Sequence, residues 1–201
     1  MTVQQPRTAT VRRKTTETEI EVELNIDGSG ELDKIQIKSG LGLVDHLLGH
    51  VAFHGFFDLK LSCKGDLHVD AHHSNEDIGI VLGQAFAKAL DEKVGINRYG
   101  FAACPMDEDY AEVAIDMGDR YAFVAMQLPE CGDKPKIEDA EEYSMHLALD
   151  LLDSFAKKAN INLHVSYRGH ELHHVAEAIF KAFGRALDEA CKIDPRRKGV
   201  P

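Results

Sequence analysis

Hydrophobic and polar residues along the chain switch repeatedly between two periods. Alternation with period two is typical of strands with one buried face, and apolar residues at i, i+3 and i+4 are typical of helices. We therefore expect strands near residues 7–13, 18–27, 33–38, 58–70, 98–104, 110–118, 120–128 and 161–168, and helices near residues 44–55, 73–92, 142–159 and 174–192. Strands joined by short hairpins and followed by helices favour an α+β fold. Residues 129–135 are expected to form a loop.

The chain also carries an internal repeat. His72-His73-Ser74-Asn75-Glu76 recurs as His173-His174-Val175-Ala176-Glu177, and each motif follows an alternating segment and opens an apolar helical pattern. Self-similarity of this kind indicates a duplicated structural unit. We expect two half-repeats, residues 1–95 and 96–201, that form one compact domain. In that domain, two four-stranded sheets have helices packed between them.

The repeated H-H-x-x-E motif suggests metal binding. Residues i and i+4 of a helix share one face, so His72 and Glu76 can bind one ion, whereas His73 is rotated by about 100°. Two adjacent histidines therefore suit two ions, or one ion and a contact with a neighbouring chain. One such motif would be weak evidence, because a lone histidine is usually a surface or core residue. Two motifs in matching contexts favour a metal site. Imidazole and carboxylate donors without thiolate fit manganese, iron or zinc.

A further histidine lies at the start of the first predicted helix. We expect His46 to be a metal ligand as well. His50 and His54 follow it at i+4 and i+8, on the same stripe of the helix. We interpret those two histidines as structural.

Composition narrows the class of partner. The 201 residues carry a formal net charge of −11, which argues against nucleic acid or an anionic membrane as the main partner. A few local cations could still bind a small anionic metabolite. Cys63, Cys104, Cys131 and Cys191 form no C-x-x-C pair, so neither a zinc nor a redox motif is indicated. The absence of an apolar leader or span predicts a cytoplasmic protein.

Several segments resemble the imidazoleglycerol-phosphate dehydratase family. They are Gly40 to Leu48, Gly65 to Asp77, Ile96 to Gly100, Pro105 to Glu108 and His173 to Ala182. The resemblance covers nearly the whole chain. It implies a duplicated α+β fold like domain 2 of ribosomal protein S5. It also implies self-association into 24-subunit shells built from trimers, with active sites between subunits.

The resemblance further implies an activity and a set of site residues. The family dehydrates imidazole glycerol phosphate to imidazole acetol phosphate in histidine biosynthesis and uses two Mn²⁺ ions per active site, with Fe²⁺ or Zn²⁺ as alternatives. Metal-ligand roles carry over to His46, His72, His73, Glu76, His173, His174 and Glu177. Catalytic roles fall on Glu17, as the acid/base, and on His46 and His72. Substrate-binding roles fall on Glu17, Arg98, Arg120 and Lys181.

The sequence departs from the family pattern at four places. The family usually has a histidine one strand and helix before the second H-H-x-x-E. Here either Asp150, by gapless alignment, or His146, one turn earlier, could supply that ligand. Ala71 replaces the usual second aspartate before the first double histidine. Gly169 to Leu172 replaces a G-x-N sequence, and the chain ends at Pro201, where the family adds a Ser-Lys loop.

Two other functions fit the same residues. One is a metal-assisted hydrolase of a phosphorylated metabolite, in which a metal-bound water attacks phosphorus. The other is a non-catalytic shell protein in which metal only joins subunits. The departures at Ala71, Asp150 and the C-terminus add weight to the second of these alternatives.

Overall fold

The strands and helices follow the predicted order. The computed structural model describes residues 6–129, 137 and 143–201. The first half contains β1 (Thr8–Lys14), β2 (Thr18–Asn25), the 3₁₀ turn η1 (Leu32–Lys34), β3 (Ile35–Lys38), α1 (Gly42–His54), β4 (Asp58–Gly65) and α2 (His72–Leu90). The second half contains β5 (Tyr99–Met106), β6 (Asp109–Asp116), β7 (Ala122–Gln127), α3 (Met145–Ala159), β8 (Asn162–Arg168) and α4 (Leu172–Cys191).

The two halves share one sheet topology. The strand orders are β1-β2-β4-β3 and β5-β6-β8-β7, and in each sheet only the last pair is parallel. That parallel pair needs a crossover connection, which α1 provides in the first half and α3 in the second. The predicted duplicated α+β fold is therefore confirmed. The boundary at residue 95 stays a prediction.

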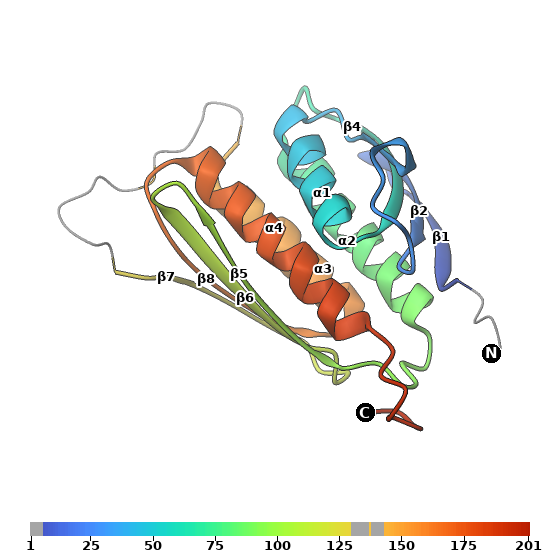
Figure 1. The fold of residues 1–201 in the computed structure, drawn as a ribbon. Helices are drawn as coiled ribbons and strands as arrows, with labels where there is room; N and C mark the ends of the chain where they lie inside the picture. Colours follow the sequence, from blue (N-terminus) through green and yellow to red (C-terminus); the bar gives the residue numbers. More distant parts are fainter. Residues whose placement is uncertain (1–5, 130–136, 138–142) are drawn as a thin grey trace.

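The helices form a double layer between the two sheets (Figure 1). In the central strands β2 and β6, every second side chain is buried, because one face of each sheet packs on helices. A row of edge-to-face rings joins both halves: Phe57, Phe86, Phe155 and Phe183 have successive centroid separations of 5.5, 5.5 and 5.1 Å. This geometry is the favourable one for aromatic pairs. No helix in the described part of the chain is both long and apolar enough to cross a membrane.

Two glycines allow the helices of opposite halves to approach closely. A Cβ on Gly184 of α4 would lie 2.6 Å from the carbonyl oxygen of Val51 on α1. A Cβ on Gly83 of α2 would lie 2.4 Å from the carbonyl oxygen of Phe155 on α3. Gly83 and Gly184 each lie eleven residues after the first histidine of their H-H-x-x-E motif. The duplication therefore reproduces the helix crossings as well as the sheets.

Several element boundaries differ from the predicted ones, and three of them have a clear local cause. The strand expected over 58–70 ends at Gly65, because residues 66–71 turn toward the start of α2. The strand expected over 33–38 loses its first two residues to the 3₁₀ turn. The third predicted helix begins at Met145 rather than 142, because the Ser144 side chain accepts the Leu147 N–H and caps it. Of the predicted loop 129–135, residues 130–135 lie outside the described residues.

Replacing Gly184 by alanine is expected to destabilise the protein. The new methyl group must push α4 away from the α1 backbone, and overpacking of this kind costs about 1–3 kcal/mol. Urea unfolding of metal-free protein measures the change. Gly49→Ala in α1 is the matched control, because a Cβ there meets nothing within 4 Å. Equal unfolding midpoints for Gly184→Ala and the parent would contradict the close crossing.

Candidate active site

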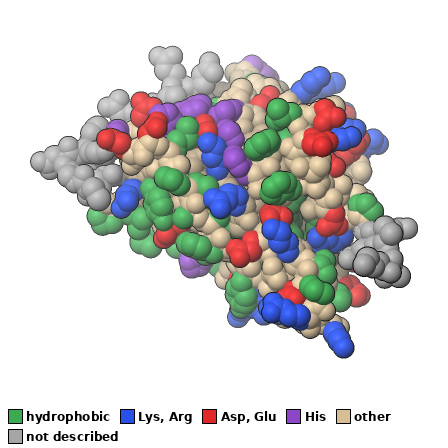
Figure 2. All heavy atoms as spheres, in the orientation of Figure 1, with side chains coloured by type: hydrophobic (Ala, Val, Ile, Leu, Met, Phe, Trp, Pro, Cys, Tyr) green, Lys and Arg blue, Asp and Glu red, His purple; other side chains and the backbone are tan. Residues whose placement is uncertain are grey.

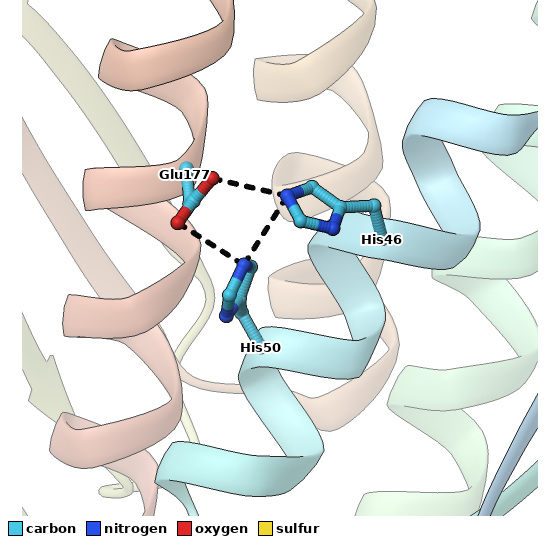
Figure 3. A group of neighbouring side chains, drawn as sticks. All are labelled: His46, His50 and Glu177. Carbon is cyan, nitrogen blue, oxygen red and sulfur yellow. Dashed lines mark hydrogen bonds and ion pairs between the residues drawn. The ribbon is translucent and has the colours of Figure 1, made fainter.

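Two histidines and a glutamate converge where α1 crosses α4 (Figure 3). His46 Nε2 lies 3.0 Å from Glu177 Oε2, and His50 Nε2 lies 3.2 Å from Glu177 Oε1. His173, one turn before Glu177, places its Nε2 3.2 Å from Oε2. The opposite oxygen also meets Lys181 Nζ at 2.5 Å. The carboxylate thus lies among three imidazoles and one ammonium group.

The charge states of this cluster suit metal binding. Burial alone would raise the pKa of Glu177, but hydrogen bonds from Lys181 and His46 outweigh it and lower that pKa to about 2. Burial lowers the pKa of His50 to about 4, although the Glu177 carboxylate opposes the shift. At neutral pH, Glu177 is therefore ionised and His50 is neutral. These are the protonation states in which carboxylates and imidazoles bind metals.

A hollow of about 440 Å³ opens beside the cluster. Its polar wall contains His46, His50, His54 and Lys181, and its apolar wall contains Leu32, Ile35 and Phe53. Figure 2 shows histidine side chains gathered in a band on the face in view, next to basic and acidic groups. A small substrate could therefore reach the imidazoles and the Lys181 ammonium group from the same side.

The H-H-x-x-E motif of the first half-repeat forms a related cluster where α2 crosses α3. His72 Nδ1 lies 3.7 Å from Asp150 Oδ2, and Glu76 follows His72 by one turn of α2. Asp150 Oδ2 is buried and has no hydrogen-bond partner among the described residues. A buried carboxylate oxygen without a partner is costly, and a cation beside His72 would satisfy it. The donors present here therefore fit a divalent metal. His146, the alternative ligand, is exposed on α3.

The second histidine of each motif points to different partners. His73 Nδ1 lies 3.1 Å from Asp66 Oδ2, and that hydrogen bond raises the pKa of His73. His174 Nδ1 lies 3.8 Å from carboxylate oxygens of Asp107 and Asp109. A carboxylate on one ring nitrogen orients a ligand histidine and leaves its Nε2 available for metal. Glu17 shares the His73 region: it is exposed, and its carbonyl accepts the Asp66 N–H at 3.1 Å.

The predicted phosphate-binding cations do not all lie near the imidazoles. Arg98 forms a bidentate ion pair with Asp116, and the hydrogen bond from Arg98 lowers the pKa of the Asp116 carboxyl. The exposed side chain of Arg120 lies 4.0 Å from Asp116. The Arg98 N–H bonds the carbonyl of Ala190 near the end of α4. Helix rise places Ala190 about 20 Å from Glu177 along α4. Only Lys181 lies beside the imidazoles.

His50 is the residue that sequence reasoning assigned to a structural role and that the structure brings into the cluster. The available signal was its i+4 spacing from His46, which places both rings on one helix face. That spacing could not indicate a partner, because Glu177 is 127 residues further along the chain. The predicted site residues themselves divide between the α1/α4 cluster, the α2/α3 cluster, the Asp66 region, the region of Asp107 and Asp109 beside His174, and the Asp116 region.

The fold and these clusters define a class of protein. It comprises duplicated α+β proteins that place imidazoles and carboxylates side by side at two equivalent helix crossings. The sequence profile of imidazoleglycerol-phosphate dehydratase matches residues 39–187. A dehydratase of this name from Pelobacter propionicus is 47% identical over 196 residues, which is 96% of this chain and 95% of that protein. The one from Thermoanaerobacter pseudethanolicus is 47% identical over 196 residues, covering 97% and 96%.

Solved structures agree with these sequence matches. A crystal structure of IGPD from Pyrococcus furiosus in complex with (S)-C348 superposes with a TM-score of 0.76 at 30% identity, covering 92% of this chain and 96% of that one. The imidazoleglycerol-phosphate dehydratase of Staphylococcus aureus gives 0.75 at 28% identity, covering 93% and 99%. The chain belongs to the imidazoleglycerol-phosphate dehydratase family. It is therefore a hydro-lyase, and the predicted family and enzyme class are confirmed.

Asp150→Asn tests the α2/α3 cluster. The amide removes a buried charge, so the metal-free protein should be as stable as the parent or more stable. Added Mn²⁺ should raise the unfolding temperature of the parent and raise it less in the variant, since ligand binding stabilises the folded state. Asp153→Asn is the control, because Asp153 accepts a hydrogen bond from Tyr121 Oη at 2.5 Å and an amide can still accept it. An equal Mn²⁺ effect in both variants would remove Asp150 from the site.

Proposed function

We propose that this protein catalyses the manganese-dependent dehydration of imidazole glycerol phosphate to imidazole acetol phosphate in histidine biosynthesis. The main support is the ionised, buried Glu177 carboxylate held among His46, His50 and His173 in a chain of this family. Neutral imidazoles beside a carboxylate form a donor set for a borderline divalent cation.

Each helix crossing supplies the donors for one ion. His46, His173 and Glu177 serve the α1/α4 ion, and His72, Glu76 and Asp150 serve the α2/α3 ion, with His146 as the alternative to Asp150. His73 and His174 face other directions and complete ion sites of neighbouring chains. When bound, two Mn²⁺ ions, with Fe²⁺ or Zn²⁺ as alternatives, supply Lewis acidity toward the imidazole ring of the substrate.

Glu17 accepts the carbon-bound proton of the substrate. Dehydration breaks one C–H and one C–O bond and releases water, so a residue must accept the carbon-bound proton and the leaving oxygen must gain one. Glu17 is an exposed carboxylate in the turn between β1 and β2, and its carbonyl bonds the Asp66 N–H next to His73. This position gives it access to a substrate held at the subunit surface.

The phosphate-binding residues come from two chains. Lys181 lines the hollow beside His46, whereas the Arg98 backbone bonds Ala190 near the far end of α4, and helix rise places Ala190 about 20 Å from Glu177. Imidazole glycerol phosphate, an imidazole ring on a three-carbon phosphorylated chain, is too short to span such a separation, so Arg98 and Arg120 act on a substrate bound to the metal residues of another subunit. We therefore propose self-association, in shells of 24 subunits built from trimers.

A turnover assay separates this function from its alternatives. Chelator-treated protein should regain the conversion of imidazole glycerol phosphate when Mn²⁺ is added, without release of inorganic phosphate. His72→Ala should lose metal and reduce turnover at least about 100-fold, because a first ligand of the α2/α3 ion is removed. His68→Ala is the control, because His68 is an exposed histidine in the preceding turn.

Other results of this assay would identify a different function. Release of inorganic phosphate would indicate a hydrolase. If chelation disrupts assembly and no condition gives turnover, the protein would be a non-catalytic shell protein whose subunits are joined by metal. Full metal content together with full activity in His72→Ala would contradict the proposed ligand set.

Lys181→Ala is expected to raise the KM without changing the bound metal. The ammonium group lies at the rim of the hollow and would contribute a charge-assisted contact to the substrate phosphate, worth about 1.5–3 kcal/mol, or roughly 10- to 100-fold in KM. Steady-state kinetics and metal analysis measure the two effects. Lys157→Ala, at the end of α3, is the control. An unchanged KM would remove Lys181 from the phosphate site.

A further inference from the structure

His46, His50 and Glu177 form a closed triangle of side chains, in which each pair is joined by one short contact and the two contacts to Glu177 use different carboxylate oxygens (Figure 3). The separations are 3.0 Å from His46 Nε2 to Glu177 Oε2, 3.2 Å from His50 Nε2 to Glu177 Oε1, and 3.2 Å from His46 Nε2 to His50 Nε2. Within the described part of the chain, this is the one group of three such side chains whose ligand atoms all lie within 4.8 Å of each other.

Hydrogen bonds cannot satisfy all three edges of this triangle. An imidazole nitrogen carries either a proton or a lone pair, and the ionised carboxylate only accepts. The two edges to Glu177 each require a protonated Nε2. The edge between His46 and His50 requires one protonated nitrogen and one lone pair. These requirements conflict in every tautomer, so one edge always places two like groups face to face.

A cation at the centre removes the conflict. Both Nε2 atoms and the Glu177 carboxylate then present lone pairs to one charge. Bonds of about 2.0–2.1 Å give separations between neighbouring ligand atoms of about 2.8–3.0 Å in octahedral geometry and about 3.3–3.4 Å in tetrahedral geometry. The three contact distances, from 3.0 to 3.2 Å, begin at the upper end of the octahedral range and stay below the tetrahedral one. Two imidazoles and one carboxylate on one side of an ion also leave its other coordination positions open.

We propose that His50 is a further metal ligand, so that one subunit holds a divalent cation between α1 and α4 through His46, His50 and Glu177. The inference deepens the proposed function and rests on its metal dependence. His173 Nε2 also lies 3.2 Å from Glu177 Oε2, but His173 is outside the group whose ligand atoms all lie within 4.8 Å of one another. Without His50, the described residues would hold no such group of three.

The other half of the chain lacks this third ligand. The alignment that matches Asp150 with His46 places Ser154 opposite His50, and Ser154 is a buried residue of α3. A hydroxyl group is a weaker ligand for Mn²⁺ or Zn²⁺ than imidazole. A single chain therefore binds the α1/α4 ion more tightly than the α2/α3 ion, and the two ions load in a fixed order.

The experiment compares His50→Gln with His54→Gln in the full chain. His54 lies one turn further along α1 and lines the same hollow, but it is outside the triangle. Chelator-treated proteins are titrated with Mn²⁺ by calorimetry and with Co²⁺ by visible absorption. His50→Gln should weaken the tightest Mn²⁺ site at least about 10-fold and change the Co²⁺ spectrum. His54→Gln should stay within about 2-fold of the parent with an unchanged spectrum.

Unfolding of the metal-free variants separates ligation from packing. His50→Gln should unfold at or above the parent temperature without metal, because the crowded edge is relieved. A lower unfolding temperature with unchanged Mn²⁺ affinity would overturn the inference. His50→Asn, whose amide is shorter, is the second variant. His46→Ala separates failure of this inference from failure of the proposed function. If His46→Ala abolishes the tight Mn²⁺ site and His50→Gln does not, only the ligand role of His50 is wrong. If neither variant changes Mn²⁺ binding, the proposed function fails as well.

Discussion

The buried carboxylate of Glu177 constrains the whole arrangement of α1 and α4. Its side chain is 7% exposed, and an ion removed from water requires compensating partners. Those partners are the imidazoles of His46, His50 and His173 and the ammonium group of Lys181. Because they are short-range contacts from two helices, they require a close crossing, which Gly184 allows by carrying no side chain. Backbone packing and site chemistry are therefore coupled at one point.

The duplication supplies a second crossing with the same backbone but different chemistry. Gly83 and Gly184 each meet a carbonyl of the opposing helix, so the α2/α3 and α1/α4 pairs have equivalent geometry. The side chains at equivalent positions of the two half-repeats differ: Asp150 in α3 occupies the position of His46 in α1. The carboxylate of Asp150 is left with a buried, unpartnered oxygen, whereas the α1/α4 cluster surrounds its carboxylate with donors. Equivalent crossings thus carry different sets of donor groups.

The distribution of polar groups over the subunit explains why assembly forms part of the proposed function. His73 and His174 each place one ring nitrogen near aspartates and are directed away from the helix crossings. Arg98 is fixed by Asp116 near the far end of α4. A single chain therefore carries these predicted site residues in separate regions. In the proposed function, the surfaces of different chains bring them onto one small substrate.

The sequence by itself determined the elements, the duplication and the family. Hydrophobic periodicity and the repeated H-H-x-x-E motif are local signals, so they can be recognised in the sequence alone. The errors in predicted secondary structure were confined to the ends of elements, such as residues 66–70. The partners of His46, His50 and Asp150 were decided only by tertiary structure. These helix crossings join residues 78 to 131 positions apart, and no local spacing encodes them. His50 illustrates the difference: its spacing placed it beside His46, but only the crossing with α4 placed both histidines around Glu177.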